Sequence, residues 1–194
     1  FDILGDFGEV AIMAKKKILD ETGLQVGKPL KVMLAVKVED INEAFKAVGK
    51  PALLEFKLDG FRCAIHKKGN EIKLFTRRME DVTKQFKEVT DLIKNNVKCK
   101  ECILDSEFVG YDPKTKKYLP FQNISQRIRR KYNIEKMARK FPVEVNIFDI
   151  LYYNGKDLLG ETQDKRRDLI EKIVKNKKYK IKLTEKLITD DVRK

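Results

Sequence analysis

The sequence has few of the residues that build disulfide frameworks, metal clusters and membrane spans. Its 194 residues include three cysteines, one histidine, five prolines and no tryptophan. A small, odd number of cysteines argues against the disulfide framework of a secreted domain. No stretch approaches the ~20 consecutive apolar residues of a membrane span, and the opening string FDILGDFGEV lacks the basic-then-apolar order of a signal peptide. We therefore expect an intracellular, cytoplasmic protein without membrane contacts.

Two of the cysteines, Cys99 and Cys102, have the spacing of half a zinc site. A structural zinc site takes four Cys or His ligands, but there is no second pair and His66 is the only histidine. A redox C-x-x-C motif would open a helix, whereas this one leads into strand-like sequence. We expect neither zinc nor redox chemistry here, and we expect His66 on the surface of a strand.

Positive charge is what the sequence has in excess, and it is concentrated in two segments. There are 43 Lys and Arg against 30 Asp and Glu, a formal net charge of +13. Residues 122–140 carry seven basic residues and one acid, residues 165–194 carry twelve and five, and the rest of the chain is neutral. Such blocks indicate contact with a polyanion. For the second block, a solvated lysine-rich helix face is the alternative.

Length and periodicity predict one domain of the α+β class with an antiparallel sheet. A helix capped by Asp6 is expected to stop near Gly23, and a second helix fits residues 40–48. From Ala52 onward, apolar and polar residues alternate with the period of two that is typical of a strand. The Asp59-Gly60 and KKGN turns divide this segment into a predicted three-stranded meander. Later come a helix over 82–93, strands over 102–112 and 143–153, and a basic helix over 164–176.

The first predicted strand, ALLEFKL, carries residues suited to catalysis. Strand side chains alternate, so Glu55 and Lys57 share a face, and Arg62 returns across the turn within about 10 Å. A lysine amine becomes a nucleophile when a nearby cation and partial desolvation favour its neutral form. Lys57 is therefore the candidate nucleophile; the alternative is a surface hairpin whose Glu and Lys are merely solvated.

Two later strands have polar faces of the same kind. In CILDSEFVG, Asp105 and Glu107 share a face, and paired carboxylates suit a metal ion or ribose hydroxyls. In VEVNIFDIL, alternation puts Phe148 on the polar face with Glu144 and Asn146. An aromatic ring there suits either stacking on adenine or packing in a second core behind a buried sheet.

The string EFKLDGFRCAIHKKGNEIKLFTRRMEDVT resembles the active-site segment of ATP-dependent DNA ligases, most closely the archaeal type. The likeness continues through ILDSEFVGYD, PFQNISQRIRRKY and VNIFDILYYNGKDL, and it covers GDFGEVA and GKPLKVMLA before the lysine. It implies an antiparallel-sheet nucleotidyltransferase fold, ATP-grasp-like, as in the adenylation domain of DNA ligases. Residues 1–28 would then be the last helix and linker of an N-terminal DNA-binding domain, and residues 29–194 the N-terminal part of the adenylation domain.

The resemblance also implies a role for each matching residue. Lys57 would attack the α-phosphate of ATP, form a lysyl-AMP and release pyrophosphate. At the base, Glu55 would contact the adenine amino group and Phe148 would stack on the ring. Arg62 would contact a phosphate or the nicked DNA end, and Arg77 the ribose or a phosphate. Glu107 would hold the ribose, or Mg²⁺ or another divalent cation. Contacts to the DNA backbone are expected from Arg127, Arg129, Arg130 and Lys131.

The implied reaction seals nicks in duplex DNA during replication, repair and recombination. AMP passes to the 5′-phosphate of the nick, and the 3′-hydroxyl then displaces it. The expected partners are nicked double-stranded DNA and, through regions outside these residues, a sliding clamp; the expected state is a monomer. The alternatives are a capping-type or RNA-ligase nucleotidyltransferase, and a nucleic-acid-binding fragment without turnover.

The resemblance also predicts that the site is incomplete. Beyond LITDD the family continues into an E-G strand motif, which supplies a metal-site Glu, and a K-x-K motif, whose lysines hold the α-phosphate. Neither occurs before Lys194. We therefore expect an adenylation domain that is incomplete at its C-terminus.

Overall fold

The computed structural model describes residues 6–19 and 23–193. Its helices are α1 (Phe7–Lys16), α2 (Ile41–Val48), α3 (Lys87–Asn96), α4 (Phe121–Ile128), α5 (Ile134–Lys140) and α6 (Gln163–Ile173), with a 3-10 turn η2 (Lys84–Phe86). Its strands are β1 (Ala52–Glu55), β2 (Phe61–Lys68), β3 (Glu71–Thr76), β4 (Glu101–Gly110), β5 (Val143–Tyr153), β6 (Lys156–Asp157), β7 (Ile181–Leu183) and β8 (Lys186–Thr189). None of the helices in this described part is long and apolar enough to cross a membrane.

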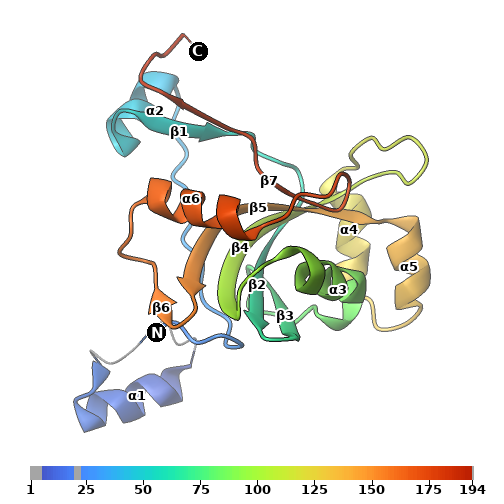
Figure 1. Ribbon diagram of the computed structural model, residues 1–194, viewed down its shortest axis with the longest axis horizontal. Coiled ribbons are helices and arrows are strands. Elements are labelled where there is room, and N and C mark those ends of the chain that lie inside the picture. The colour runs from blue at the N-terminus through green and yellow to red at the C-terminus, as the bar shows by residue number, and fades with distance from the viewer. Residues whose placement is uncertain (1–5, 20–22, 194) are drawn as a thin grey trace.

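The strands form one large and one small sheet (Figure 1). The large sheet has the order β3-β2-β4-β5-β6, with antiparallel neighbours throughout, and β7 adds to β5 in the parallel direction. The small sheet pairs β1 with β8 in the antiparallel direction. The predicted α+β class with an antiparallel sheet is therefore confirmed.

The predicted three-stranded meander is wrong in its first strand. β2 and β3 form the expected hairpin, but β1 pairs with β8, so that Ala52 lies opposite Thr189 and Glu55 opposite Lys186. The strand ends at Glu55, and the chain crosses from the small sheet to the large one between β1 and β2. An alternating pattern predicts a strand but does not identify its partner, and here the partner is near the other end of the chain.

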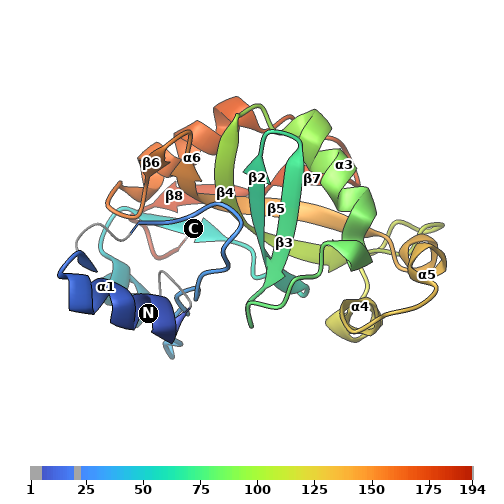
Figure 2. The same cartoon turned by 90° about the horizontal axis from the view of Figure 1, so that it is seen from below.

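The core lies between the large sheet and helices α3, α4 and α6 (Figure 2). These helices present apolar side chains at helical spacing, among them Val89, Ile93, Ile124 and Ile170. The sheet meets them with alternate residues of β2, β4 and β5, including Ile65, Leu104, Phe108, Val145 and Ile147. One face of the sheet is thus used for this packing, and the opposite face carries polar residues together with a smaller apolar cluster of Leu24, Leu30 and Ile103.

His66 lies on that opposite face and is buried, contrary to the expected surface position. It is 1% exposed, its Nδ1 accepts a hydrogen bond from the Gly27 backbone at 3.0 Å, and its ring meets Phe75 edge to face. Burial, helped by the charge of Lys73, lowers the pKa of His66 to about 4. The segment that includes Gly27 covers this part of the sheet, and the sequence pattern of β2 alone could not show that cover.

Local sequence signals placed several element ends correctly. Asp6 caps α1 by accepting from the Glu9 backbone at 3.0 Å, and Asp40 caps α2. Helix α1 ends at Lys16, because Lys17 adopts a left-handed conformation, so the helix is shorter than predicted. α1 lies apart from the sheets in Figure 1, and the division of the chain near residue 28 stays a prediction.

Arg127 departs from its expected role as an exposed DNA contact, because its side chain is a core element. It is 1% exposed and stacks on the Phe86 ring, 4.2 Å from the centroid. Its guanidinium donates to the carbonyls of Phe141 (2.9 Å) and Gln85 (2.7 Å) and to the Glu88 carboxylate (2.6 Å). These contacts join α4 to the segments on either side of it and leave the guanidinium unavailable to a phosphate.

Replacing Arg127 with Met should therefore destabilise the chain, because two buried carbonyls lose their donor. The free energy of unfolding should fall by about 2–4 kcal/mol. The matched control is Arg129→Met, two residues on and exposed, where the change should stay within about 0.5 kcal/mol. Urea denaturation of both variants measures the difference. Equal stabilities would mean that Arg127 is not a structural residue.

Candidate active site

The segment between β1 and β2 carries Lys57 and lies directly on β4. A Cβ added to Gly60 would lie 2.2 Å from the carbonyl oxygen of Phe108, so only glycine permits this close approach. Asp59 accepts a weak hydrogen bond, 3.4 Å long, from the backbone N–H of Phe121 at the start of α4. The Asp-Gly pair of the K-x-D-G motif thus fixes the end of the loop, and Lys57 is exposed beside β4.

Glu107 is the carboxylate of β4 that Lys57 faces. Burial raises the pKa of Glu107 to about 7; the charge of Lys57 and a hydrogen bond from the Gly60 backbone act in the opposite direction, and nearby Asp105 raises it further. Lys57 and Glu107 therefore interact electrostatically at the same end of the large sheet. Near neutral pH this carboxyl exchanges readily between its charged and neutral forms.

Arg62 of β2 is held on the same face as Glu107. Its Nε donates to both oxygens of Asp105 at 3.0 Å, its Nη2 donates to Oδ2 at 2.5 Å, and its Nη1 donates to the Met33 carbonyl at 2.7 Å. Asp105 is 1% exposed, so this is a largely buried, multidentate pair. Alternation along the strand predicts that Asp105 shares a face with Glu107, but it does not indicate that Asp105 holds Arg62.

Phe148 lies against Arg62 at an irregularity in β5. Ser106 is opposite Ile147 while Asp105 is opposite Asp149, so the register with β4 shifts at Phe148. The guanidinium carbon of Arg62 lies 5.6 Å from the centroid of the Phe148 ring. The half-buried ring is therefore on the polar face, next to Arg62.

Glu55 ends β1 and is tied to the large sheet by residues that the sequence did not single out. Its Oε1 accepts from Nη1 of Arg167 at 2.8 Å and from Oγ1 of Thr184 at 2.5 Å. Arg167 belongs to the basic helix α6, which lies in the second of the two charged segments that the sequence predicts to contact a polyanion. The neighbouring Arg166 pairs with Asp149 at 2.8 and 3.0 Å. No local signal distinguishes these two arginines from solvent-exposed ones.

The remaining predicted residues lie on exposed turns. Arg77 follows β3 and is exposed; Thr76, at the end of that strand, lies beside Cys63 of β2, which lies beside Ser106 of β4. Arg77 is therefore at the same end of the sheet as Arg62. The exposed residues Arg129, Arg130 and Lys131 form the turn between α4 and α5.

The described residues, those of this site included, contain no cluster of three or more His, Cys, Asp or Glu side chains placed to hold a metal ion. The sulfurs of Cys99 and Cys102 lie 2.9 Å apart at the start of β4, and Cys102 is buried.

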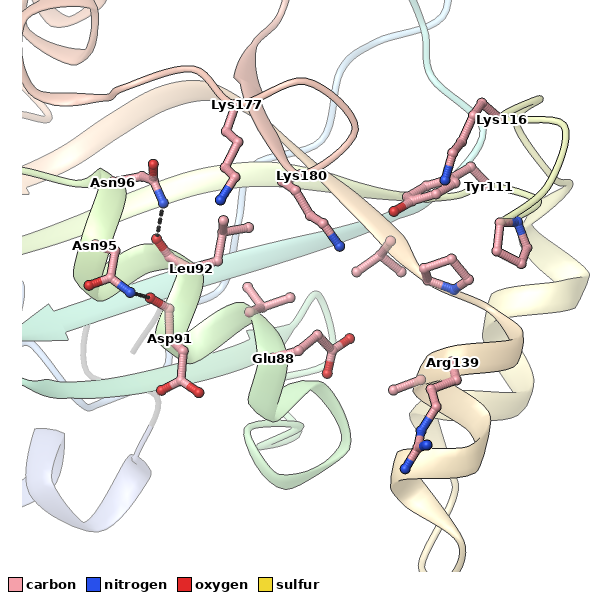
Figure 3. A pocket seen from close by; sticks show the side chains of 15 residues that line it. Glu88, Asp91, Leu92, Asn95, Asn96, Tyr111, Lys116, Arg139, Lys177 and Lys180 are labelled. Carbon is pink, nitrogen blue, oxygen red and sulfur yellow. Dashed lines mark hydrogen bonds between the residues drawn. The ribbon is translucent and has the colours of Figure 1, made fainter.

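A cavity of about 600 Å³ lies away from the predicted site residues, among α3, the loop after β4, the start of β5 and the turn before β7 (Figure 3). Lys177 and Lys180 extend toward it, while Asn95 and Asn96 bond to carbonyls of their own helix. It contains none of the predicted site residues.

The fold and the site together define a class of protein. A lysine sits on a K-x-D-G loop against an antiparallel sheet, and an arginine, a glutamate and an aromatic ring from three neighbouring strands lie on the polar face beside it. This arrangement agrees with the nucleotidyltransferase fold that the sequence resemblance implies.

Sequence comparison identifies the family within this class. The family model described as "ATP dependent DNA ligase domain" matches residues 32–194. The chain is 49% identical to the DNA ligase of Nanoarchaeum equitans (strain Kin4-M) over 197 aligned positions, which cover 100% of the chain and 35% of the relative. It is 39% identical to the DNA ligase of Thermococcus onnurineus (strain NA1), with 98% and 34% covered. The chain belongs to the ATP-dependent DNA ligase family and spans about a third of the length of these curated relatives.

Solved structures show the same fold. The ligase domain of LigD from M. tuberculosis matches with a TM-score of 0.50 and 23% identity, covering 70% of this chain and 40% of that one. A structure titled "Pmar-Lig_Pre." matches with a TM-score of 0.54 and 17% identity, covering 94% of this chain and 40% of that one. The nucleotidyltransferase fold of a ligase adenylation domain is thereby confirmed.

The raised pKa of Glu107 predicts a pH-dependent stability. A glutamate that titrates at 4.5 when unfolded and at about 7 when folded stabilises the folded chain fully below pH 4.5, and this contribution is lost as the pH rises through 7. Glu107→Gln stays neutral, so it should match wild type near pH 4 and exceed its unfolding free energy by about 1–2 kcal/mol at pH 8. Urea denaturation at the two pH values tests this. Glu135→Gln, on the exposed surface of α5, is the control, and a Glu107 variant with the same pH dependence as wild type would contradict the assignment.

Proposed function

We propose that this chain is the lysine-bearing part of a DNA ligase adenylation domain, and that Lys57 becomes covalently linked to AMP. The observation that supports this best is the K-x-D-G loop itself. Gly60 seats the loop on the β4 backbone and brings Lys57 beside Glu107, within a chain of the ATP-dependent DNA ligase family. The amine attacks the α-phosphorus of ATP, a P–N bond forms, and the bond to the leaving pyrophosphate breaks.

The surrounding residues bind and neutralise the nucleotide. Arg62, held by Asp105, directs positive charge toward the phosphates, and Arg77 adds charge from the turn after β3. Phe148 offers a flat surface to the adenine ring, and Glu55 accepts from the amino group of the base. Positioning and charge neutralisation together supply most of the catalysis in phosphoryl transfer.

Glu107 suits the ribose hydroxyls or a divalent cation. Burial raises the pKa of Glu107, and a cation bound beside it would favour the charged form of this carboxylate. Asp105 is engaged by Arg62, so one carboxylate is available. Mg²⁺ is commonly held by one or two carboxylates together with substrate phosphates, and Glu107 would serve in that way. The cation would neutralise developing charge on the phosphates.

In the later steps, AMP is transferred to the 5′-phosphate of nicked duplex DNA and displaced by the 3′-hydroxyl, the reaction used in replication, repair and recombination. Arg129, Arg130 and Lys131 supply exposed charge for the DNA backbone. A DNA substrate also accounts for an intracellular location. We further propose that the protein acts as a monomer and binds a sliding clamp as a second partner.

Covalent labelling tests the nucleophile. Incubated with α-labelled ATP and Mg²⁺, the chain should acquire label that survives denaturation, whereas Lys57→Arg should acquire none, because a guanidinium stays protonated and cannot attack phosphorus.

Lys46→Arg, on the exposed surface of α2, is the control for the labelling experiment and should label like wild type. Equal labelling of wild type and Lys57→Arg would place the nucleophile elsewhere. Wild type that stays unlabelled would contradict the proposed activity for this chain.

The salt dependence of DNA binding tests the basic turn between α4 and α5. Changing Arg129, Arg130 and Lys131 to Gln should reduce the slope of log K against log salt for nicked DNA by ~0.9 for each phosphate that the protein no longer neutralises. The control neutralises three exposed lysines on and beside α3, another helix of the same core face: Lys87, Lys94 and Lys98. If both triple variants change the slope equally, the turn is not a specific DNA contact.

A further inference from the structure

Arg167 is a buried arginine whose hydrogen bonds converge on the carboxylate of Glu55. Its side chain is 4% exposed. Nη1 donates to Oε1 of Glu55 and to Oγ1 of Thr184, both at 2.8 Å; Nη2 donates to the Thr184 carbonyl; and Nε donates to Glu171 at 3.4 Å. The guanidinium is thus oriented through all three of its nitrogens. It gives Glu55 a fixed partner rather than a mobile surface counter-ion.

Thr184 completes this arrangement. Its hydroxyl accepts from Arg167 and donates to Oε1 of Glu55 at 2.5 Å, so both side chains act on the same carboxylate oxygen. Within the part of the chain that the structure describes, the hydrogen bonds of Glu55 end on Oε1. The second oxygen, Oε2, is therefore the one available to a donor from outside the protein. Because Arg167 and Thr184 hold Oε1, the orientation of the carboxylate, and with it the direction of Oε2, is fixed.

The tertiary structure brings these three residues together from separate elements. Glu55 is the last residue of β1 in the small sheet, Arg167 lies on α6, which packs against β5, and Thr184 follows β7 of the large sheet. Lys57 is only two residues beyond Glu55. The contact therefore fixes the position of Glu55 relative to the large sheet, close to the proposed nucleophile.

We propose that Arg167 and Thr184 are positioning residues for nucleotide selection, holding Glu55 so that Oε2 accepts a hydrogen bond from the 6-amino group of adenine. The proposal rests on the proposed function, in which Glu55 meets the base. An ionised carboxylate can only accept hydrogen bonds. Guanine presents a carbonyl oxygen at the same ring position, and a carboxylate that cannot turn away would repel it. A freely rotating Glu55 would discriminate less.

Equilibrium binding of three nucleotides tests this proposal. The probes are ATP, GTP and purine riboside 5′-triphosphate, which lacks the 6-amino group. Thr184→Val keeps the side-chain shape and removes the hydroxyl, so the preference for ATP over both other nucleotides should fall about 3- to 10-fold, the net value of one typical hydrogen bond. Arg167→Lys keeps the charge but loses the planar fork, so a larger loss is expected.

A matched control separates positioning from general stability. Thr189→Val removes the hydroxyl of another buried threonine, on β8, whose Oγ1 bonds, among the described residues, only with the backbone of Asp191, and it should leave the nucleotide preference unchanged. In a Glu55→Gln background, Thr184→Val should produce no further loss of preference, because the carboxylate that it positions is gone.

The outcomes distinguish the two proposals. If wild type prefers ATP and folded Thr184→Val keeps the full preference, the positioning role is overturned. It is also overturned if Thr184→Val weakens all three nucleotides equally, since that is the result of a purely structural role. If wild type binds none of the three nucleotides, the proposed function falls, and the positioning role with it.

Discussion

The close approach of Gly60 to the main chain of β4 is the constraint on which the site depends. The chain must pass from the small sheet into β2 at this point, and no side chain fits between the loop and the Phe108 carbonyl. Because the loop is seated there, β2 begins with Phe61 opposite Phe108 and Arg62 opposite Glu107. This register puts the apolar residue into the core and the arginine onto the polar face. The position of Lys57 beside Glu107 follows from the same contact.

Carboxylates on and beside the polar face are paired with arginines that come from a neighbouring strand or from helix α6. Arg62 holds Asp105 across adjacent strands, while Arg166 and Arg167, neighbours on α6, hold Asp149 and Glu55. Burying such groups is favourable only when their hydrogen bonds are satisfied, which requires the strands and the helix to be correctly placed. The site therefore depends on the whole packed domain, and α6 contributes both core side chains and two of the orienting cations.

Net charge proved an incomplete guide to surface function. Of the basic residues in the two charged segments, Arg127 and Arg167 are buried and Arg166 is tied to Asp149, while Arg129, Arg130 and Lys131 are exposed. Composition counts all of them alike. An arginine becomes structural where carbonyls or carboxylates from distant segments surround it, as around Arg127. For that reason the proposed DNA contact rests on the exposed turn alone.

The sequence by itself determined the α+β class, the helix caps at Asp6 and Asp40, the β2–β3 hairpin, and the parity that puts Asp105 with Glu107. Each follows from interactions between residues close in the chain or from alternation along one strand. Tertiary structure alone decided that β1 pairs with β8, that His66 and Arg127 are buried, that the β5 register shifts at Phe148, and that Arg167 and Thr184 hold Glu55. These features join segments far apart in sequence, and a local pattern predicts which residues face the core without specifying which distant segment will meet them.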